Sequence, residues 1–158
     1  MRKRIVASQP AQPRGESDQA WLDLEQIATV EVTSEDPGFP IESVFGFNGG
    51  PGWRASQKGE QQIRIIFDEP RPLHRIQLRF HEIGSERMQE FTVRWSPAAG
   101  GPPKEIVRQQ WNFSPSGSTT EIEDYVIDLD AVSVLELAIQ PDRGRGEAVA
   151  TLAAWRLR

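Results

Sequence analysis

The sequence predicts an all-β fold, an antiparallel β-sandwich of the jelly-roll type with about eight strands. Apolar and polar residues alternate along short segments, for example at Ile76, Leu78 and Phe80, which is the pattern of a strand with one buried face. Turn signals separate these segments at intervals of roughly ten residues. The 13 glycines and 12 prolines among 158 residues suit a domain with many turns better than a helical bundle.

Length and composition indicate one domain, residues 21–158, after a leader at residues 1–20 that we expect to be disordered. The absence of cysteine excludes disulfides, thiolate zinc sites and cysteine nucleophiles. The net charge of −5 opposes nonspecific nucleic-acid binding, which requires a basic surface. The sequence shows neither a secretory signal nor an apolar run of the roughly 20 residues that a membrane span needs. We therefore expect no membrane partner and a cytoplasmic protein.

The first half of the domain is expected to contain four strands, after a short helical or edge segment at residues 21–24. These strands cover residues 27–34, a short segment that carries Trp53, residues 61–67 and residues 73–80. In the third of them, Ile63, Ile65 and Phe67 fall on one face. A long loop spans residues 35–52, because its glycines and prolines would interrupt a helix or strand. Within this loop, residues 41–45 are expected to form one helical turn.

The second half is expected to contain four strands and a closing strand, and the total depends on how the Trp53 segment is counted. They comprise residues 89–96, residues 104–111, a strand through Tyr125, Ile127 and Leu129, a strand through Leu135, Leu137 and Ile139, and the closing strand at residues 148–157. Residues 96–103 and 114–118 are rich in proline, glycine and serine, and therefore form loops.

The order of these features resembles the discoidin, or coagulation factor C-type, domains of the galactose-binding-domain-like superfamily. The matching parts are Val32-Thr33-Ser34-Glu35, Pro40-Ile41-Glu42-Ser43-Val44, Gly52-Trp53-Arg54, the run from Gln62 to Pro70, and the strand from Leu73 to Phe80. The passage from Trp53 to Glu60 also resembles a domain of a eukaryotic DNA-repair scaffold of this superfamily, an interaction module. The resemblance covers residues 27–158 and implies a non-enzymatic domain that binds its ligands through loops at one end of the sandwich.

Many members of this superfamily hold a structural calcium ion beneath those loops, through an Asp-Gly pair in the first long loop and a glutamate before the last strand. This sequence has Asn48-Gly49 without the aspartate, and Asp36 and Glu147 are the remaining candidates. Calcium takes about six to eight oxygen ligands and prefers carboxylates, so this set is poor. We expect no cofactor, with calcium through Asp36, Asn48 and Glu147 as the alternative.

Trp53 and Arg54 are the first candidate ligand-binding residues. An aromatic ring in a loop either stacks on a ligand or fills the core, and burial statistics favour the core for Trp53. Arg54 either pairs with a nearby acid such as Glu60 or presents its guanidinium group to a ligand. The sequence leaves these two alternatives for Arg54 open.

The tract from Arg108 to Ser114 is a second candidate. It combines an arginine, amide side chains and two aromatic rings, which is the chemistry of carbohydrate sites, and its candidate contacts are Gln110, Trp111 and Asn112. Trp111 and Phe113 share strand parity with Val107, so burial in the core is the favoured interpretation for both rings. In that case Gln110 and Asn112 lie together on the solvent face.

His81 and Arg87 flank a glycine-containing loop and are the third candidate for ligand binding. The two histidines, His74 and His81, show no metal-ligand spacing. His81 and Glu82 as an acid–base pair would need a nucleophile or substrate pocket that the rest of the sequence does not indicate. We therefore predict no catalytic residues.

Strand parity also predicts arginines on the solvent side of consecutive strands, namely Arg64, Arg75, Arg79, Arg94 and Arg108. If these strands share one sheet, their guanidinium groups line one polar face. The favoured interpretation is a solvated, salt-bridged surface in which acids such as Glu90 and Glu105 interleave. The alternative is a docking face for an acidic protein partner or an anionic glycan.

The sequence therefore predicts a non-enzymatic binding module that acts in protein–protein interaction or assembly, through its loops or the arginine-rich face. Carbohydrate binding through loop aromatics and Arg, Asn and Gln donors is the alternative.

Overall fold

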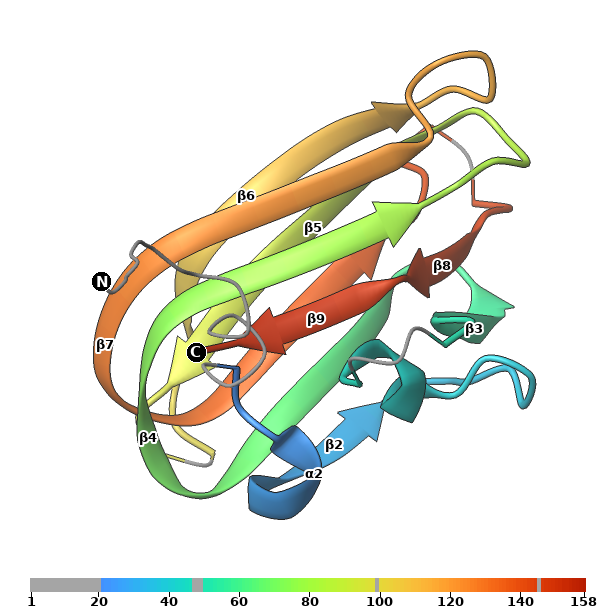
Figure 1. Ribbon diagram of the computed structural model, residues 1–158. Coiled ribbons are helices and arrows are strands. Elements are labelled where there is room, and N and C mark those ends of the chain that lie inside the picture. Colours follow the sequence, from blue (N-terminus) through green and yellow to red (C-terminus); the bar gives the residue numbers. More distant parts are fainter. Residues whose placement is uncertain (1–20, 47–49, 99, 145) are drawn as a thin grey trace, which may run out of the picture.

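The computed structural model describes residues 21–46, 50–98, 100–144 and 146–158, so the predicted leader lies outside the described residues. The described residues form eight strands in two layers (Figure 1), which confirms the predicted all-β sandwich. The strands are β2 (Ala28–Val32), β3 (Trp53–Lys58), β4 (Gln61–His81), β5 (Arg87–Ser96), β6 (Lys104–Phe113), β7 (Thr120–Gln140), β8 (Val149–Leu152) and β9 (Ala154–Leu157). Two short helical segments, α2 (Leu24–Ile27) and the 3₁₀ helix η1 (Ile41–Val44), precede β3. None of the helices among these residues has the length and apolar character needed to cross a membrane.

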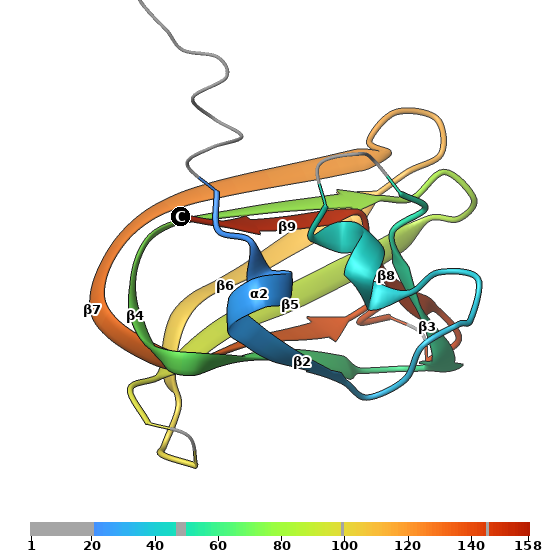
Figure 2. The same ribbon diagram turned by 60° about the horizontal axis from the view of Figure 1, so that its bottom comes forward.

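Two long strands connect the layers. β4 and β7 contain 21 residues each and pair antiparallel along most of their length. Residues 61–66 of β4 pair with residues 134–139 of β7, and residues 73–81 pair with residues 120–129. Figure 2 shows both ribbons bending together from one layer into the other. The sequence predicted four separate strands here, whereas the structure joins them in pairs.

The bend of β4 coincides with Pro70 and Pro72. Proline has no backbone N–H and cannot donate to a ladder, so a regular strand cannot pass through this segment. The β4–β7 register shifts between Ile66 and Arg71 and again on either side of Leu73. These irregularities are bulges, which bend a strand and increase its twist without ending it. The prolines therefore redirect β4 into the second layer.

Each layer is completed by strands that pair with one half of β4 or β7. In the first layer, the order is β2, the first half of β4, the second half of β7, β5 and β6. In the second layer, the second half of β4 lies between β9 and the first half of β7. β3 and β8 form a separate two-stranded ladder at one end (Figure 1). The predicted closing strand is divided at Ala153 into β8 and β9.

The core lies between the layers and follows the predicted alternation. Ile76, Leu78 and Phe80 of β4 are fully buried, as are Phe91 and Val93 of β5. The rings of Phe80 and Phe91 stack with 5.1 Å between their centroids. Burial of one such side chain contributes about 1.5–3 kcal/mol, so this alternation accounts for much of the stability.

Gly52 permits the close approach of β3 to β8. Its φ is +83°, and a Cβ atom at this position would lie 2.8 Å from the carbonyl oxygen of Leu152. The next residue, Trp53, pairs with Leu152 in the β3–β8 ladder. A side chain at Gly52 would therefore disturb this ladder directly.

We predict that Gly52→Ala destabilises the protein more than Gly59→Ala. Gly59 has the same φ of +83°, but no atom lies within 4 Å of the added Cβ. Gly59→Ala should therefore cost only the left-handed backbone strain of about 1–2 kcal/mol, whereas Gly52→Ala adds the clash with Leu152. Urea unfolding of both variants measures the difference. Equal losses of stability would contradict a tight β3–β8 contact at Gly52.

Candidate functional site

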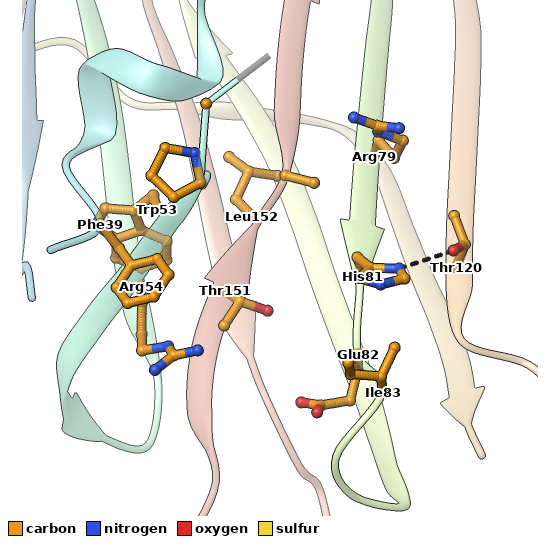
Figure 3. A pocket seen from close by; sticks show the side chains of 13 residues that line it. Phe39, Trp53, Arg54, Arg79, His81, Glu82, Ile83, Thr120, Thr151 and Leu152 are labelled. Atoms are coloured by element: carbon orange, nitrogen blue, oxygen red, sulfur yellow. Dashed lines mark hydrogen bonds between the residues drawn. The ribbon is translucent and has the colours of Figure 1, made fainter. Parts of the chain in front are cut away.

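A cavity of about 480 Å³ lies where β3 and β8 meet the end of β4. Small-molecule sites commonly have volumes of about 300–1,000 Å³, so its size suits a small ligand. Figure 3 shows Phe39 and Arg54 on one side, Arg79 and His81 on the other, and Thr151 and Leu152 between them. These residues come from the loop before η1, from β3, from the end of β4 and from β8.

One side of the cavity is formed by Arg54 and Phe39. The guanidinium carbon of Arg54 lies 4.1 Å from the centroid of the Phe39 ring, a cation–π contact. The backbone amide of Arg54 also donates to the carbonyl oxygen of Phe39, at 3.3 Å. Arg54 is exposed, and within the described part of the chain it forms no ion pair with Glu60 or another acid. Of the two alternatives for Arg54, the structure therefore favours the free guanidinium group.

The opposite side is formed by the end of β4. His81 is the last residue of this strand and pairs in register with Thr120, the first residue of β7. Its Nδ1 lies 3.0 Å from the hydroxyl of Thr120, and this contact fixes the imidazole ring. Arg79 precedes His81 by two residues, so it lies on the same solvent face of β4, and it is exposed. Both side chains thus border the cavity from a regular strand.

Arg87 lies behind the cavity and is bound to two residues that line it, Glu82 and Thr151. Only 4% of this residue is exposed, and its Nε donates to Glu82 at 2.8 Å. Its Nη2 donates to the hydroxyl of Thr151 at 3.2 Å, so one buried guanidinium group joins two cavity residues. Burial would raise the pKa of Glu82, but hydrogen bonds from Arg87 and the backbone of Gly84, with the charge of Arg87, lower it below its ordinary value. Glu82 is therefore a carboxylate already committed to Arg87.

A fully buried acid, Glu121, lies next to this network. Glu121 follows Thr120 and is completely buried, and its Oε1 accepts a hydrogen bond from Gln89 at 3.2 Å. Burial raises the pKa of Glu121 to about 9, assisted by a hydrogen bond to the Glu123 carboxylate and by its charge. Glu121 is therefore protonated at neutral pH and supplies no negative charge near the cavity.

No protein-family model matches the sequence, and no curated protein matches it. Among solved structures, a family 32 carbohydrate-binding module from a family 31 glycoside hydrolase of Clostridium perfringens superposes with a TM-score of 0.67 at 14% identity, over 92% of this chain and 98% of the module. The family 32 module of AlyQ, in complex with 4,5-unsaturated mannuronic acid, gives a TM-score of 0.61 at 14% identity, over 84% and 95%. XRCC1 bound to the DNA polymerase β catalytic domain gives 0.60 at 12% identity, over 84% and 95%.

The chain has the galactose-binding-like jelly-roll fold. The resemblance drawn from the sequence is thus confirmed at the level of the fold. Identities of this order carry no information on which ligand this jelly roll binds.

The structure brings only some of the predicted ligand-binding residues to the cavity. Arg54 and His81 border it with exposed side chains. Trp53 lies behind the cavity wall with 1% of its surface exposed, and its Nε1 donates to the carbonyl oxygen of Ser34 at 3.2 Å. It is therefore a core residue and has no ring face for a ligand. Arg87 is buried and acts through Glu82 and Thr151.

The tract on β6 does not reach the cavity. Trp111 is partly buried and packs against the core, and Phe113 is fully buried, as strand parity suggested. Gln110 and Asn112 are exposed on the outer face of β6, an edge strand of the first layer. These residues are separate from Arg54 and His81.

Phe39, Arg79 and Ile83 are among the cavity residues that were not identified from the sequence as ligand contacts. Phe39 lies in the long loop, and Arg79 was assigned only to the arginine-rich face. An aromatic residue between Gly38 and Pro40 in an irregular loop was the available signal for Phe39. For Arg79, the proximity to His81 on the same strand face was visible, but the cavity beside it was not.

The predicted arginine-rich face is divided between the two sides of the jelly roll, so the prediction of one shared face is wrong. Arg64, Arg94 and Arg108 lie on the outer face of the first layer, while Arg75 and Arg79 lie on the outer face of the second. The first three form ion pairs with Glu31, Glu136, Glu90 and Glu105 at 2.8–3.3 Å. This agrees with the salt-bridged surface that was the favoured interpretation.

The calcium candidates do not form a carboxylate cluster. Glu147 forms an ion pair with Lys58 at 2.6 Å, and Asp36 accepts a hydrogen bond from the backbone amide of Gly38 at 3.0 Å. Asn48 lies outside the described residues. In the described ranges, no group of three or more His, Cys, Asp or Glu side chains is arranged to hold a metal ion.

We predict that Glu121 makes folding stability fall as the pH rises. Its pKa rises from the ordinary value of 4.5 in the unfolded chain to about 9 in the folded protein, so the folded state retains a proton that the unfolded state releases. Stability from this group is therefore full below pH 4.5 and is lost as the pH approaches 9. Glu121→Gln keeps an acceptor for Gln89 and removes this titration.

Thermal melts between pH 5 and pH 9 measure the effect. The melting temperature of Glu121→Gln relative to the natural protein should rise steadily over this interval. Glu60→Gln, at an exposed position, is the matched control and should show no such trend. A constant difference for Glu121→Gln would show that Glu121 is already ionised in the folded state.

Proposed function

We propose that this protein is a non-enzymatic binding module that recognises a glycan in the cavity between β3 and the end of β4. The observation that carries the proposal is the grouping of hydrogen-bond donors with exposed apolar surface in one small cavity. The jelly-roll likeness to carbohydrate-binding modules, one of them solved with a bound uronic acid derivative, supports it. The alternative drawn from the sequence thus becomes the leading function, with Arg54 and His81 kept as contacts and Phe39, Arg79 and Ile83 added.

The cavity offers both kinds of contact that a sugar needs. Arg54, Arg79 and His81 supply N–H donors for hydroxyl groups from two sides. Phe39 and Ile83 supply apolar surface for the C–H face of a sugar ring, and Ile83 is 67% exposed without a covering residue. An exposed aliphatic side chain at the rim of a polar cavity is consistent with a ligand contact.

The arrangement does not fit glycoside hydrolysis. That reaction ordinarily uses two carboxyl groups on either side of the glycosidic bond, one of them as a general acid. Glu82 is the one carboxylate among the described residues that line the cavity, and it is held by Arg87. Binding without catalysis is therefore the function that this cavity supports.

Protein–protein interaction is the second candidate. XRCC1 has a similar fold and was solved in a complex with a protein partner. On this chain, Ile122 and Val126 are 63% and 86% exposed on β7, an apolar surface outside the glycan cavity. The division of the arginine-rich face between two layers removes one of the two surfaces, loops or arginine-rich face, through which this interaction was predicted.

We predict that Phe39→Ala and His81→Ala each weaken glycan binding about tenfold or more, which is the expected loss for one good contact. Glycan-array screening of the natural protein identifies the ligand, and isothermal titration calorimetry then measures each variant. Asn112→Ala on β6 is the matched control and should bind normally. If Asn112→Ala loses binding while His81→Ala keeps it, the site lies on β6 and the cavity assignment is wrong. If no glycan binds, the proposed function fails.

A further inference from the structure

We infer that the glycan is acidic, and that Arg54 and Arg79 receive its carboxylate groups in the cavity. This inference depends on the proposed function, because it assigns a substrate class to the same cavity. It is argued from the charges that line the cavity and from the partners of the other arginines.

The exposed charges of the cavity have one sign. Arg54 and Arg79 are the guanidinium groups that line it, and Glu82 is its carboxylate among the described residues. Glu82 is bound to Arg87 at 2.8 Å and its side chain is only 19% exposed. The groups left for a ligand are therefore cationic, although the whole chain carries a net charge of −5.

Arg54 and Arg79 differ in their partners from Arg64, Arg75 and Arg108, the strand arginines of the salt-bridged surfaces. Arg64, Arg75 and Arg108 each contact a carboxylate, at 3.0 Å, 2.7 Å and 2.8 Å. With 23 acidic and 18 basic residues, an acid is available near most cations. In the described part of the chain, neither Arg54 nor Arg79 forms an ion pair. The two unpaired guanidinium groups face the same cavity, which indicates an anion from outside the chain.

The Arg54 side chain is positioned before a ligand arrives, and the backbone that carries Arg79 is fixed beside β8. Arg54 is stacked over Phe39, which holds the plane of the guanidinium group while leaving its N–H edge open. The carbonyl oxygen of Arg79 accepts a hydrogen bond from the amide of Ala153 at 2.8 Å, which fixes the backbone of Arg79 beside β8. A planar guanidinium group matches a carboxylate through two parallel N–H···O bonds. Groups that are already ordered lose less entropy on binding.

The test compares sugars that differ only in charge. Calorimetric titrations use galacturonic against galactose oligomers, mannuronic against mannose oligomers, and chitosan oligomers as a cationic probe. We expect each acidic oligomer to bind about tenfold more tightly than its neutral counterpart, and this difference to shrink as salt is added. Arg54→Gln and Arg79→Gln should each remove most of the difference, because each weakens binding of the acidic oligomer more than binding of its neutral counterpart. Arg108→Gln, on the opposite layer, should change neither.

The outcomes separate this inference from the proposed function. Equal affinity for acidic and neutral sugars, or tighter binding of chitosan, would overturn the acidic preference while glycan binding itself stands. An acidic preference that survives Arg54→Gln and Arg79→Gln would also overturn it. If neither kind of sugar binds, both the inference and the proposed function fail. The salt dependence of acidic-oligomer binding by the natural protein is a further measurement, and it does not require either variant to fold.

Discussion

The antiparallel pairing of β4 with β7 is the constraint on which the rest of this jelly roll depends. Each strand contributes one half to each layer, so a single ladder fixes both layers relative to one another. The ladder also determines the cavity, because its last pair, His81 with Thr120, forms one wall. A shift of one residue in this register would reverse every side chain of a half-strand. The core and the cavity are therefore specified together.

The same end of the sandwich contains a buried polar network. Arg87 of β5 donates to Glu82 after β4, to Thr151 of β8, to Gln89, and to the carbonyl oxygen of Pro141 after β7. A buried ion pair is weak evidence for net stability, because desolvation offsets the attraction. It does restrict geometry, since each lost partner would leave a charge or donor unsatisfied. The network thus joins four chain segments beside the cavity, which it reaches through Glu82 and Thr151.

The sequence predicted the strand faces well because facing is a local property. Alternation at Ile76 and Leu78 was sufficient to place both in the core. The layer to which a half-strand belongs is not local: Arg64 and Arg75 lie on one strand yet face opposite sides, because β4 bends between them. The cavity was equally hidden, since Phe39, Arg54 and His81 meet only through the β3–β8 ladder and the end of β4. Such contacts depend on the topology of the fold, which neither the amino-acid composition nor the alternation of apolar and polar residues reveals.

The charge of the chain limits how an acidic glycan is recognised. A net charge of −5 repels a polyanion at long range, so electrostatic steering does not assist its approach. At physiological ionic strength, however, this repulsion is screened beyond about 8 Å. Inside the cavity the nearest unpaired charges are the two guanidinium groups, and at contact they outweigh more distant acids. Affinity at this site therefore comes from short-range contacts, and the overall acidity of the protein is compatible with binding an anion.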